Sequence, residues 1–430
     1  MSCNWPRVQI SEVCELIVDC VNKTAPRVDY ETPFKMLRTP NIKGGKISLN
    51  DCRFVEEDTY EKWTRRAKVV RDDVLLTREA PMGEVGIVDF DDTVFLGQRI
   101  MQYRVDRSQL DPHFLLYSFL SNDLQHQFNM HEGSGSVVSH IRVPDCSKFE
   151  LNLPPLTIQK EIAGVLKKLD RKITVNQQTN QTLEQMAQAI FKSWFVDFDP
   201  VKAKMNGEQP EGMDETTASL FPEKLVESEL GMIPEGWEVS ALSELIKLTG
   251  GGTPKRSEET YWNGDIPWFS VKDVPSGSNV FVVDTDEKIT ELGLSKSSTK
   301  LLPKGTTIIT ARGTVGKLAL VGTDMCMNQS CYGIRGKEVG DYYNYFNLKQ
   351  AVSTLQQNTH GAVFDTITTK TFDTYSLAFG GVELANKFDA LIAPLLQKIE
   401  ANVRQNIELS ALRDTLLPKL LSGEIVLDTQ

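Results

Sequence analysis

The chain has 430 residues, of which 40% are hydrophobic and 24% charged, and this ordinary composition excludes a disordered or fibrous protein. Its length predicts two domains, each able to bury a sizeable core. No stretch approaches the roughly 20 apolar residues of a membrane span, and residues 1–13 lack the layout of a secretion signal, so we expect a cytoplasmic protein without membrane contact. Seven scattered cysteines without a CxxC pair favour reduced thiols, and five dispersed histidines predict no metal site.

The formal net charge of −11 argues against a nucleic-acid partner, because neutralising phosphates requires Lys and Arg. The distribution of the charge changes this interpretation. Basic residues cluster within 62–71, and Lys255 and Arg256 lie in a glycine-rich turn, whereas acidic residues concentrate in 206–230. Solvated basic faces would explain such runs equally well if they stood alone.

The first predicted element in chain order is a mixed α/β domain over 1–157, with short strands separated by Gly- and Pro-rich turns. Within it, residues 73–89 (DVLLTREAPMGEVGIVD) predict an apolar strand, a turn that holds Arg78, and a second strand punctuated by glycine. A long helix is predicted over 158–200, and an acidic linker over 201–230.

The second domain, over 231–383, repeats the first at an offset of about 226 to 232 residues. TTIITARGTVGKLALVG (306–322) matches 73–89 and places Arg312 in the turn, while NQSCYGIRG from Asn328 matches GQRIMQYRV from Gly97. An offset of this size is too long for a solenoid unit and indicates two copies of a whole domain. A second long helix, over 384–424, follows.

Both helices carry an apolar heptad seam, so each needs a helical partner. The seam comprises Ile162, Leu166, Leu169, Ile173, Asn176, Asn180, Leu183 and Ile190 in the first helix and Ile392, Leu395, Ile399, Asn402, Asn406, Leu409 and Leu416 in the second. We expect an antiparallel pair in which Asn176 faces Asn406 and Asn180 faces Asn402, because buried asparagines bond each other and penalise slipped registers. The alternative is that the asparagines are accidental polar positions on two surface helices.

The predicted fold class is therefore α+β, with two similar mixed α/β domains separated by two long antiparallel coiled-coil helices and related by a pseudo-two-fold axis. Arg413 interrupts the seam, and Pro394 is expected to kink or delay the second helix. About 35 to 38 helical residues make a rod of roughly 55 Å. That length separates two modules by one DNA turn of about 34 to 36 Å, and because the domains differ in sequence, the two parts of such a target should differ too.

Five segments carry a family resemblance: LNLPPLTIQKEI (151–162), SWFVDFDPVKAKMNG (193–207), LFPEKLVESELGMIPEGWEV (220–239), GGGTPKRSEETYWNGDIPWFSVKDV (250–274) and ELSALRDTLLPKLLSGEIVL (408–427). As a set and in this order they resemble the characteristic segments of Type I restriction-modification specificity (S) subunits, and the likeness covers nearly the whole chain. Any single piece, such as LPPL, is weak. One departure is KTAPR (23–27), which only loosely parallels GGTPKR and has no YW counterpart, so the contact residues of the first domain are less well defined.

The resemblance implies two target-recognition domains that read an asymmetric bipartite site in double-stranded DNA. It also implies that the helical regions bind two modification subunits, with restriction subunits joining the full complex. In that family the modification subunits bind S-adenosylmethionine and methylate adenine N6, so this chain is expected to be non-catalytic and to need no cofactor. The residues agree, since the sequence has no Asn/Asp-Pro-Pro-aromatic loop, and in ARGTVGKL (311–318) Leu318 replaces the Ser/Thr of a phosphate loop.

We nominate DNA-contacting residues by their position in turns and by their chemistry, because Arg and Lys can bond guanine and Gln can bond adenine in the major groove. The candidates are Lys23, Arg38, Arg65, Arg66, Arg78 and Arg99 in the first domain and Thr253, Lys255, Arg256, Lys272, Arg312, Lys317 and Gln329 in the second. For each of them a solvated side chain is the alternative. The glycine-rich turn at 250–255 suits a DNA phosphate, or is an ordinary turn.

Phe191, Trp194, Phe195 and Phe198 are more aromatic than a two-helix seam requires, and we expect them to dock a partner subunit, with packing on their own domain as the alternative. Two other functions stay open. One is a coiled-coil scaffold without a nucleic-acid role, and the other is a fused enzyme that methylates DNA by itself.

Overall fold

The computed structural model describes residues 5–130, 140–277, 279–358 and 366–427. The chain divides into two compact units, unit 1 (1–172 with 408–430) and unit 2 (173–407). Because the two long helices pass through this division, each of them contributes one stretch to each unit.

Unit 1 alternates short strands with short helices before its long helix begins. Its strands are β1 (Arg7–Gln9), β2 (Cys14–Asp19), β3 (Lys35–Leu37), β4 (Ile42–Lys43), β5 (Lys46–Ile47), β6 (Arg53–Phe54), β7 (Val74–Arg78), β8 (Met82–Ile87), β9 (Val94–Leu96), β10 (Ile100–Val105) and β11 (Glu150–Asn152). Its helical elements are α1 (Ile10–Val13), η1 (Thr39–Asn41), α2 (Glu57–Trp63), α3 (Pro112–Leu120), α4 (Asn122–Asn129), η2 (Val143–Ser147) and the start of α5 (Leu156–Phe195).

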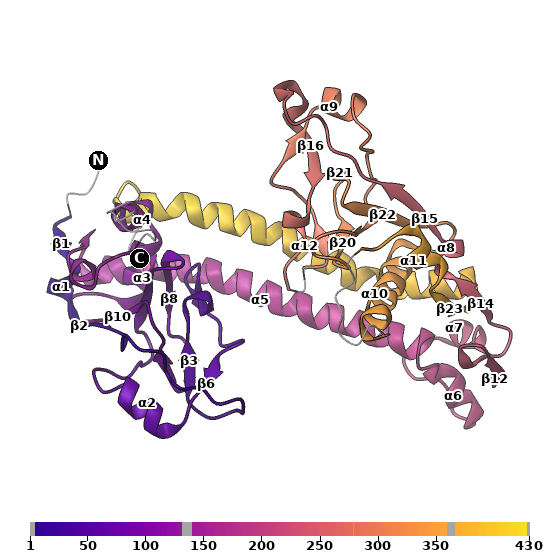
Figure 1. Ribbon diagram of the computed structural model, residues 1–430, viewed down its shortest axis with the longest axis horizontal. Helices are drawn as coiled ribbons and strands as arrows, with labels where there is room; N and C mark the ends of the chain where they lie inside the picture. The colour runs from indigo at the N-terminus through magenta and orange to yellow at the C-terminus, as the bar shows by residue number, and fades with distance from the viewer. Residues whose placement is uncertain (1–4, 131–139, 278, 359–365, 428–430) are drawn as a thin grey trace. The chain divides into compact units, whose positions relative to one another are not determined.

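The main sheet of unit 1 has the antiparallel order β2-β10-β7-β8, and the order β6-β3-β9 forms a smaller sheet (Figure 1). The predicted strands at 73–89 are β7 and β8. Asp111 begins α3 because its carboxylate accepts the backbone N–H groups of His113 and Phe114, each at 3.0 Å, and Pro112 needs no such partner. Helices α3 and α4 then pack their apolar side chains against β8, completing the core of this unit.

Unit 2 repeats this order of elements. Its strands are β12 (Leu225–Ser228), β13 (Gly231–Pro234), β14 (Glu238–Ala241), β15 (Ile246–Gly250), β16 (Trp262–Phe269), β17 (Phe281–Val282), β18 (Lys288–Ile289), β19 (Thr307–Thr310), β20 (Leu318–Val321), β21 (Cys326–Met327), β22 (Cys331–Gly336) and β23 (Ser376–Phe379). Its helical elements are α6 (Asp199–Met205), α7 (Glu215–Ser219), α8 (Leu242–Leu245), η3 (Glu259–Tyr261), η4 (Val271–Asp273), α9 (Glu291–Ser295), α10 (Asp341–Asn358), α11 (Thr369–Asp373) and α12 (Val382–Leu421), which continues into unit 1.

The two larger sheets of unit 2 repeat the strand order of those of unit 1. The order β15-β22-β19-β20 reproduces β2-β10-β7-β8 and adds β17 at the edge, and β18-β16-β21 reproduces β6-β3-β9. In both units the central strand of the small sheet pairs in parallel with one neighbour, β3 with β9 and β16 with β21. The internal duplication inferred from the sequence is therefore present at the level of topology.

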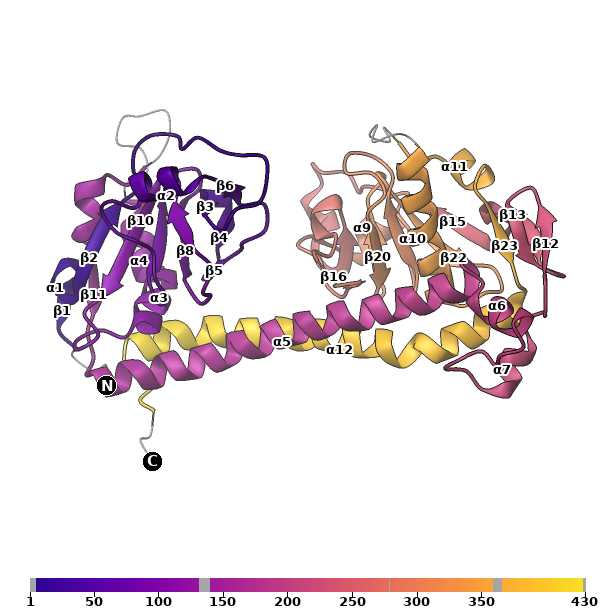
Figure 2. The ribbon, with the colours of Figure 1, turned by 90° about the horizontal axis from the view of Figure 1, so that it is seen from below.

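Within each unit the local stretches of α5 and α12 lie side by side and run antiparallel (Figure 2). In unit 2, Asn176 Nδ2 donates to Asn406 Oδ1 at 2.8 Å, and Asn402 Nδ2 donates to Asn180 Oδ1 at 2.8 Å. The expected register of the four asparagines is thus the observed one. In unit 1, Arg413 does not point away from the pair, because its Nη1 donates to Asp170 Oδ1 of α5 at 2.8 Å.

The seam differs in detail from the heptad expectation. Ile162, Leu166, Ile173, Ile392 and Ile399 are buried as expected. The other apolar seam positions are half-buried, namely Leu169, Leu183, Ile190, Leu395, Leu409 and Leu416. On α12 the neighbouring residues Leu396 and Leu417 are buried instead, because a helix of 3.6 residues per turn drifts away from a strict seven-residue repeat.

The segment between the domains and the start of the second helix differ from what the sequence suggested. The segment 201–230, expected to be an acidic linker, is folded into α6, α7 and β12, and Val201 and Phe221 from it are buried in the core of unit 2. A sequence rich in acid can still fold when a few apolar side chains anchor it. Pro394 does not delay the second helix, because α12 begins ahead of it at Val382 and continues to Leu421.

The aromatic cluster on α5 is a core and not a docking surface. Phe191, Trp194 and Phe195 are 3%, 5% and 8% exposed. Their rings pack on rings from α12, α10 and the folded segment after α5, including Phe388, Tyr343 and Phe221. Phe198 is half-buried, and its ring lies 5.5 Å from that of Trp237 in an edge-to-face contact. This burial favours the alternative of packing within the domain for Phe191, Trp194 and Phe195, while partner contact by Phe198 stays a prediction.

Candidate nucleic-acid interface

In unit 2, main-chain hydrogen bonds gather three segments around residues 327–330. Gly252 N donates to Met327 O at 3.0 Å, Asn328 N donates to Phe269 O at 2.9 Å, and Ala311 N donates to Ser330 O at 2.8 Å. The glycine-rich loop, the end of β16 and the β19–β20 turn therefore meet at the short connection that leads into β22. The exposed side chain of Gln329 lies at the centre of this frame.

The glycine-rich loop approaches this connection too closely for any side chain. A Cβ at Gly251 would lie 1.9 Å from the carbonyl oxygen of Asn328, so only glycine fits. The approach brings the Thr253 hydroxyl within hydrogen-bonding reach of Gln329, where it donates to Oε1. Two of the nominated residues are thus bonded to each other.

Arg256 is held by its neighbours. Its guanidinium stacks 4.0 Å from the ring centre of Trp262 and 4.9 Å from that of Trp268, and its Nη2 donates to Glu287 Oε2 at 3.0 Å. The bond to Arg256 lowers the pKa of Glu287, and the same bond raises the pKa of Arg256. Trp268 Nε1 in turn donates to Gly252 O at 3.0 Å. The tryptophan on which Arg256 stacks is therefore hydrogen-bonded to the glycine-rich loop.

The other candidates of unit 2 are exposed cations at the rim of the same frame. Lys272 lies in η4, directly after the end of β16, and Lys255 lies in the glycine-rich loop. Arg312 and Lys317 flank the β19–β20 turn, which is closed by a bond of 2.8 Å from Gly316 N to Thr310 O. Exposed cations beside a neutral amide can bind phosphates and base edges.

Unit 1 contains the same frame, built from equivalent main-chain bonds. Gly97 N donates to Leu37 O at 2.8 Å, as Asn328 N does to Phe269 O. Arg78 N donates to Arg99 O at 2.8 Å, as Ala311 N does to Ser330 O. A further bond is also alike, because Ile141 N donates to Arg78 O and Ile367 N donates to Ala311 O, both at 3.0 Å, whereas the bond from Gly252 N to Met327 O has no counterpart among the described residues of unit 1.

A residue that sequence reasoning did not nominate occupies the centre of the unit 1 frame. Gln98 is exposed and follows Gly97 as Gln329 follows Asn328, and Thr24 Oγ1 donates to Gln98 Oε1 at 3.4 Å. The signal was available, because the repeat already aligned Gly97 with Asn328 and so aligned Gln98 with Gln329. The nomination by charge favoured the next residue, Arg99, over the neutral amide of Gln98.

Several candidate arginines of unit 1 are already bonded to other groups. Arg78 is half-buried, and its Nη1 donates to Ile141 O at 3.0 Å. Arg38 Nη2 donates to Asp51 O at 2.8 Å, Arg99 lies 3.5 Å from Glu79, and Arg66 pairs with Asp19.

Lys23 and Arg65 are exposed on neighbouring segments. These segments are joined where Trp63 Nε1 donates to Lys23 O at 3.3 Å. All six candidates of unit 1 therefore lie on segments at or next to one frame.

The described residues offer hydrogen-bonding groups and cations, and little acid–base chemistry. Across the described ranges, no group of three or more His, Cys, Asp or Glu could hold a metal ion. Burial raises the pKa of Cys331, the cysteine next to the unit 2 frame, to about 12, so this thiol stays protonated. None of the helices among these residues is long and apolar enough to cross a membrane.

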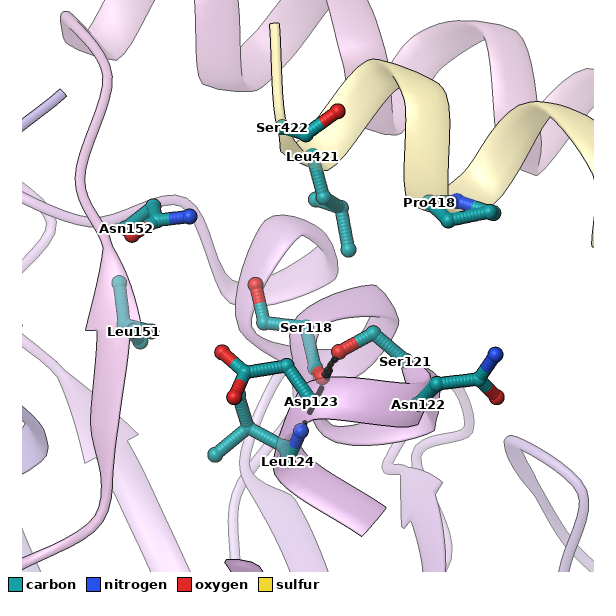
Figure 3. A pocket seen from close by; sticks show the side chains of 10 residues that line it. All are labelled: Ser118, Ser121, Asn122, Asp123, Leu124, Leu151, Asn152, Pro418, Leu421 and Ser422. Atoms are coloured by element: carbon teal, nitrogen blue, oxygen red, sulfur yellow. Dashed lines mark hydrogen bonds between the residues drawn. The ribbon is translucent and has the colours of Figure 1, made fainter. Parts of the chain in front are cut away.

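A pocket in unit 1 is a packing junction and not a second site (Figure 3). It encloses about 120 Å³ between the turn that joins α3 to α4, strand β11 and the end of α12. Two of its polar groups are bonded within unit 1, since the Ser121 hydroxyl donates to Ser118 O at 2.6 Å and Asp123 pairs with Arg7 at 3.0 Å.

Comparison with known proteins shows which proteins this chain is similar to. The family model described as "Type I restriction modification DNA specificity domain" matches residues 3–185 and 234–402. A Type I restriction enzyme HindI specificity subunit of Haemophilus influenzae is 29% identical over 431 residues, which cover 89% of this chain and 94% of that protein. The MjaIX specificity subunit of Methanocaldococcus jannaschii is 25% identical over 368 residues, which cover 82% of this chain and 77% of that protein.

Among solved structures, the S subunit of a Type I restriction-modification system from M. genitalium matches with a TM-score of 0.57 at 16% identity. The match covers 99% of this chain and 97% of that chain. At this identity the likeness shows a shared fold. The duplicated architecture described above is therefore found in another protein whose sequence has diverged widely.

Proposed function

Because the chain belongs to the family of Type I restriction modification DNA specificity domains, we propose that it recognises an asymmetric bipartite site in double-stranded DNA, with unit 1 reading one part and unit 2 the other. The chain is the specificity subunit of a Type I restriction-modification system and is not itself an enzyme. What we propose is that the target is an asymmetric bipartite site in double-stranded DNA and that each unit reads one part of it.

The observation that carries the proposal is one backbone frame used twice with different side chains. Around the central glutamine, unit 1 places Arg38, Arg78 and Arg99 where unit 2 places Ser270, Ala311 and Ser330. Since base pairs are distinguished by the pattern of donors and acceptors that faces them, two frames with different side chains suit two different sequences. An asymmetric target follows from this difference.

We further propose that two modification subunits, which carry S-adenosylmethionine, and restriction subunits assemble on this chain. The names of the two relatives support this, because each is a specificity subunit of a Type I restriction enzyme. The exposed faces of α5 and α12 offer apolar side chains for such contacts, among them Val175, Met186 and Leu412 at 45%, 48% and 47% exposure. The buried ring cluster around Trp194 has no part in this proposal.

The helix pair is proposed to set the gap between the two parts of the target. Removing one heptad from each helix shortens the pair by roughly 10 Å, or about three base pairs of 3.4 Å. The methylated motif of the variant is then expected to have a shorter gap with both half-sequences unchanged. A variant whose half-sequences changed while the gap stayed constant would refute the spacer role.

The experiment that tests the function is sequencing of methylated adenines in the host genome with and without this chain, combined with gel shifts of the chain alone and with the modification subunit. The expected result is one bipartite, asymmetric motif that depends on the chain, and a specific shift chiefly with the complex. A scaffold without a nucleic-acid role predicts no shift and no motif. A chain that methylates DNA by itself predicts methylation without the modification subunit.

A further inference from the structure

We propose that Gln98 and Gln329 are equivalent base-reading residues, each contacting one adenine, and that Thr24 and Thr253 are the residues that position their amides. This inference rests on the proposed function and deepens it. It assigns one glutamine–adenine contact to each part of the target. The other side chains around the two glutamines differ between the units.

The two glutamines occupy the same place in the two units. Each is exposed and follows directly after the residue whose N–H bonds the end of a neighbouring strand, Gly97 to Leu37 O and Asn328 to Phe269 O. Each precedes the residue whose carbonyl accepts from the β7–β8 or β19–β20 turn. Such fixed backbone placement on both sides is what a base-reading side chain needs, because docking errors of an ångström break paired hydrogen bonds.

A glycine clears the approach in both units, though at different points. In unit 1 a Cβ at Gly97 would lie 2.6 Å from Leu37 O, and in unit 2 a Cβ at Gly251 would lie 1.9 Å from Asn328 O. In unit 1 the close approach holds the segment that carries Gln98 against the end of β3. In unit 2 it holds the glycine-rich loop, which contacts Gln329, against the connection at Asn328. The backbone of the frame is therefore preserved while the surrounding side chains vary.

The threonine hydroxyl orients each amide. Thr24 Oγ1 donates to Gln98 Oε1 at 3.4 Å, and Thr253 Oγ1 donates to Gln329 Oε1. An amide oxygen has two lone pairs, so after this bond it can still accept one hydrogen bond, while Nε2 can donate. Since Oε1 faces the threonine, the donor and acceptor sides of the amide are defined before DNA binds.

This arrangement complements adenine. In the major groove adenine offers the N6 amino donor and the N7 acceptor, which an amide satisfies with Oε1 and Nε2. Guanine offers two acceptors, O6 and N7, and leaves the amide oxygen without a donor. A glutamine oriented by threonine therefore selects adenine over guanine.

The nearby arginines are less available for this role. Arg256 is stacked on two tryptophans and bonded to Glu287, and Arg78 donates to Ile141 O. Among the described residues, by contrast, Nε2 of each glutamine donates to no protein atom. The central amides thus keep an uncommitted donor at the centre of each frame, alongside the exposed cations Lys255, Arg312 and Lys317 at the rim of the unit 2 frame.

The test uses the full chain co-expressed with its modification subunit, with selection of bound duplexes from a randomised library. Gln98→Ala is expected to relax base preference at one adenine position of one half-sequence, and Gln329→Ala at one adenine position of the other half-sequence. The expected loss of preference is roughly 5- to 150-fold at that position. Gln209→Ala, which removes an exposed glutamine outside both frames, is the matched control and is expected to select the wild-type motif.

The threonines have their own readout. Thr253→Val keeps the shape of the side chain and removes the hydroxyl, so it is expected to reduce discrimination of adenine from guanine at the Gln329 position. Thr253→Ser restores the hydroxyl and is expected to restore the discrimination. Equal discrimination by the Val and Ser variants would overturn the positioning role.

The outcomes separate this inference from the proposed function. If the wild-type complex selects a bipartite motif and neither glutamine variant alters it, the base-reading assignment fails while the function stands. Relaxation of the same half-sequence by both variants, or at a position that is not adenine, also overturns the assignment. If the wild-type complex selects no bipartite motif, the proposed function itself fails.

Discussion

The asparagine pair Asn180–Asn402 should show strong energetic coupling. Both side chains are buried, at 0% and 1% exposure, and Asn402 Nδ2 donates to Asn180 Oδ1 at 2.8 Å. Replacing Asn402 by Ala leaves a buried carbonyl oxygen without that donor, which costs about 1–3 kcal/mol. Asn180 Nδ2 still donates to Asn279 Oδ1 at 3.3 Å, but Asn180 Oδ1 has already lost the Asn402 donor, so the second substitution costs less than it does in the wild-type chain.

We therefore expect the double variant Asn180→Ala/Asn402→Ala to be destabilised by less than the sum of the single variants, with a coupling of about 1–3 kcal/mol. Urea unfolding followed by tryptophan fluorescence measures this. The signal is dominated by unit 2, which holds Trp194, Trp237, Trp262 and Trp268 of the six tryptophans.

The control cycle combines Asn180→Ala with Gln397→Ala, an exposed position on α12, and is expected to be additive within about 0.5 kcal/mol. Additivity of Asn180→Ala and Asn402→Ala as well would refute the argument that the buried amides depend on each other.

Two further predictions concern the core of unit 2. Asp389 accepts a bond of 2.6 Å from Tyr343 N, yet burial raises its pKa from 3.8 to about 6, so the free energy of unfolding should fall by up to about 3 kcal/mol as pH rises from about 4 to 6. Asp389→Asn is expected to abolish this slope in urea unfolding between pH 4 and 7, and an unchanged slope would contradict it. Trp194→Ala is expected to destabilise unit 2 by about 3–5 kcal/mol, and Phe198→Ala by less because Phe198 is half-buried. Equal losses in circular-dichroism-monitored unfolding would show that burial is not the cause.

Local pattern carried much of the architecture. The repeat of 73–89 at 306–322 predicted two copies of one domain, because a strand–turn–strand motif is encoded in neighbouring residues. The heptad spacing predicted two long helices, and the asparagines at matching positions predicted their register, because a polar group buried in an apolar seam favours the register that gives it a hydrogen-bonding partner on the other helix. These features depend on residues whose partners are fixed by periodicity.

The candidate site was only partly predictable. Position in turns found Thr253 and Gln329, but charge led to Arg256 and Arg78, whose guanidinium groups the fold has already bonded to Glu287 and to a backbone carbonyl. Whether a cation is free or committed depends on residues distant in the chain. Sequence spacing does not report that.

The sequence by itself determined the duplication, the two helices and the phase in which their asparagines meet, since each follows from short-range periodicity. Only the tertiary structure decided that the rings around Trp194 form a core, that the acidic segment 201–230 is folded, and that Thr24 and Thr253 bond the amides of Gln98 and Gln329. The physical reason is that burial and hydrogen-bond partnership are properties of segments brought together in space. An aromatic ring or an amide has the same letter in the sequence whether it faces water, another ring or a hydroxyl.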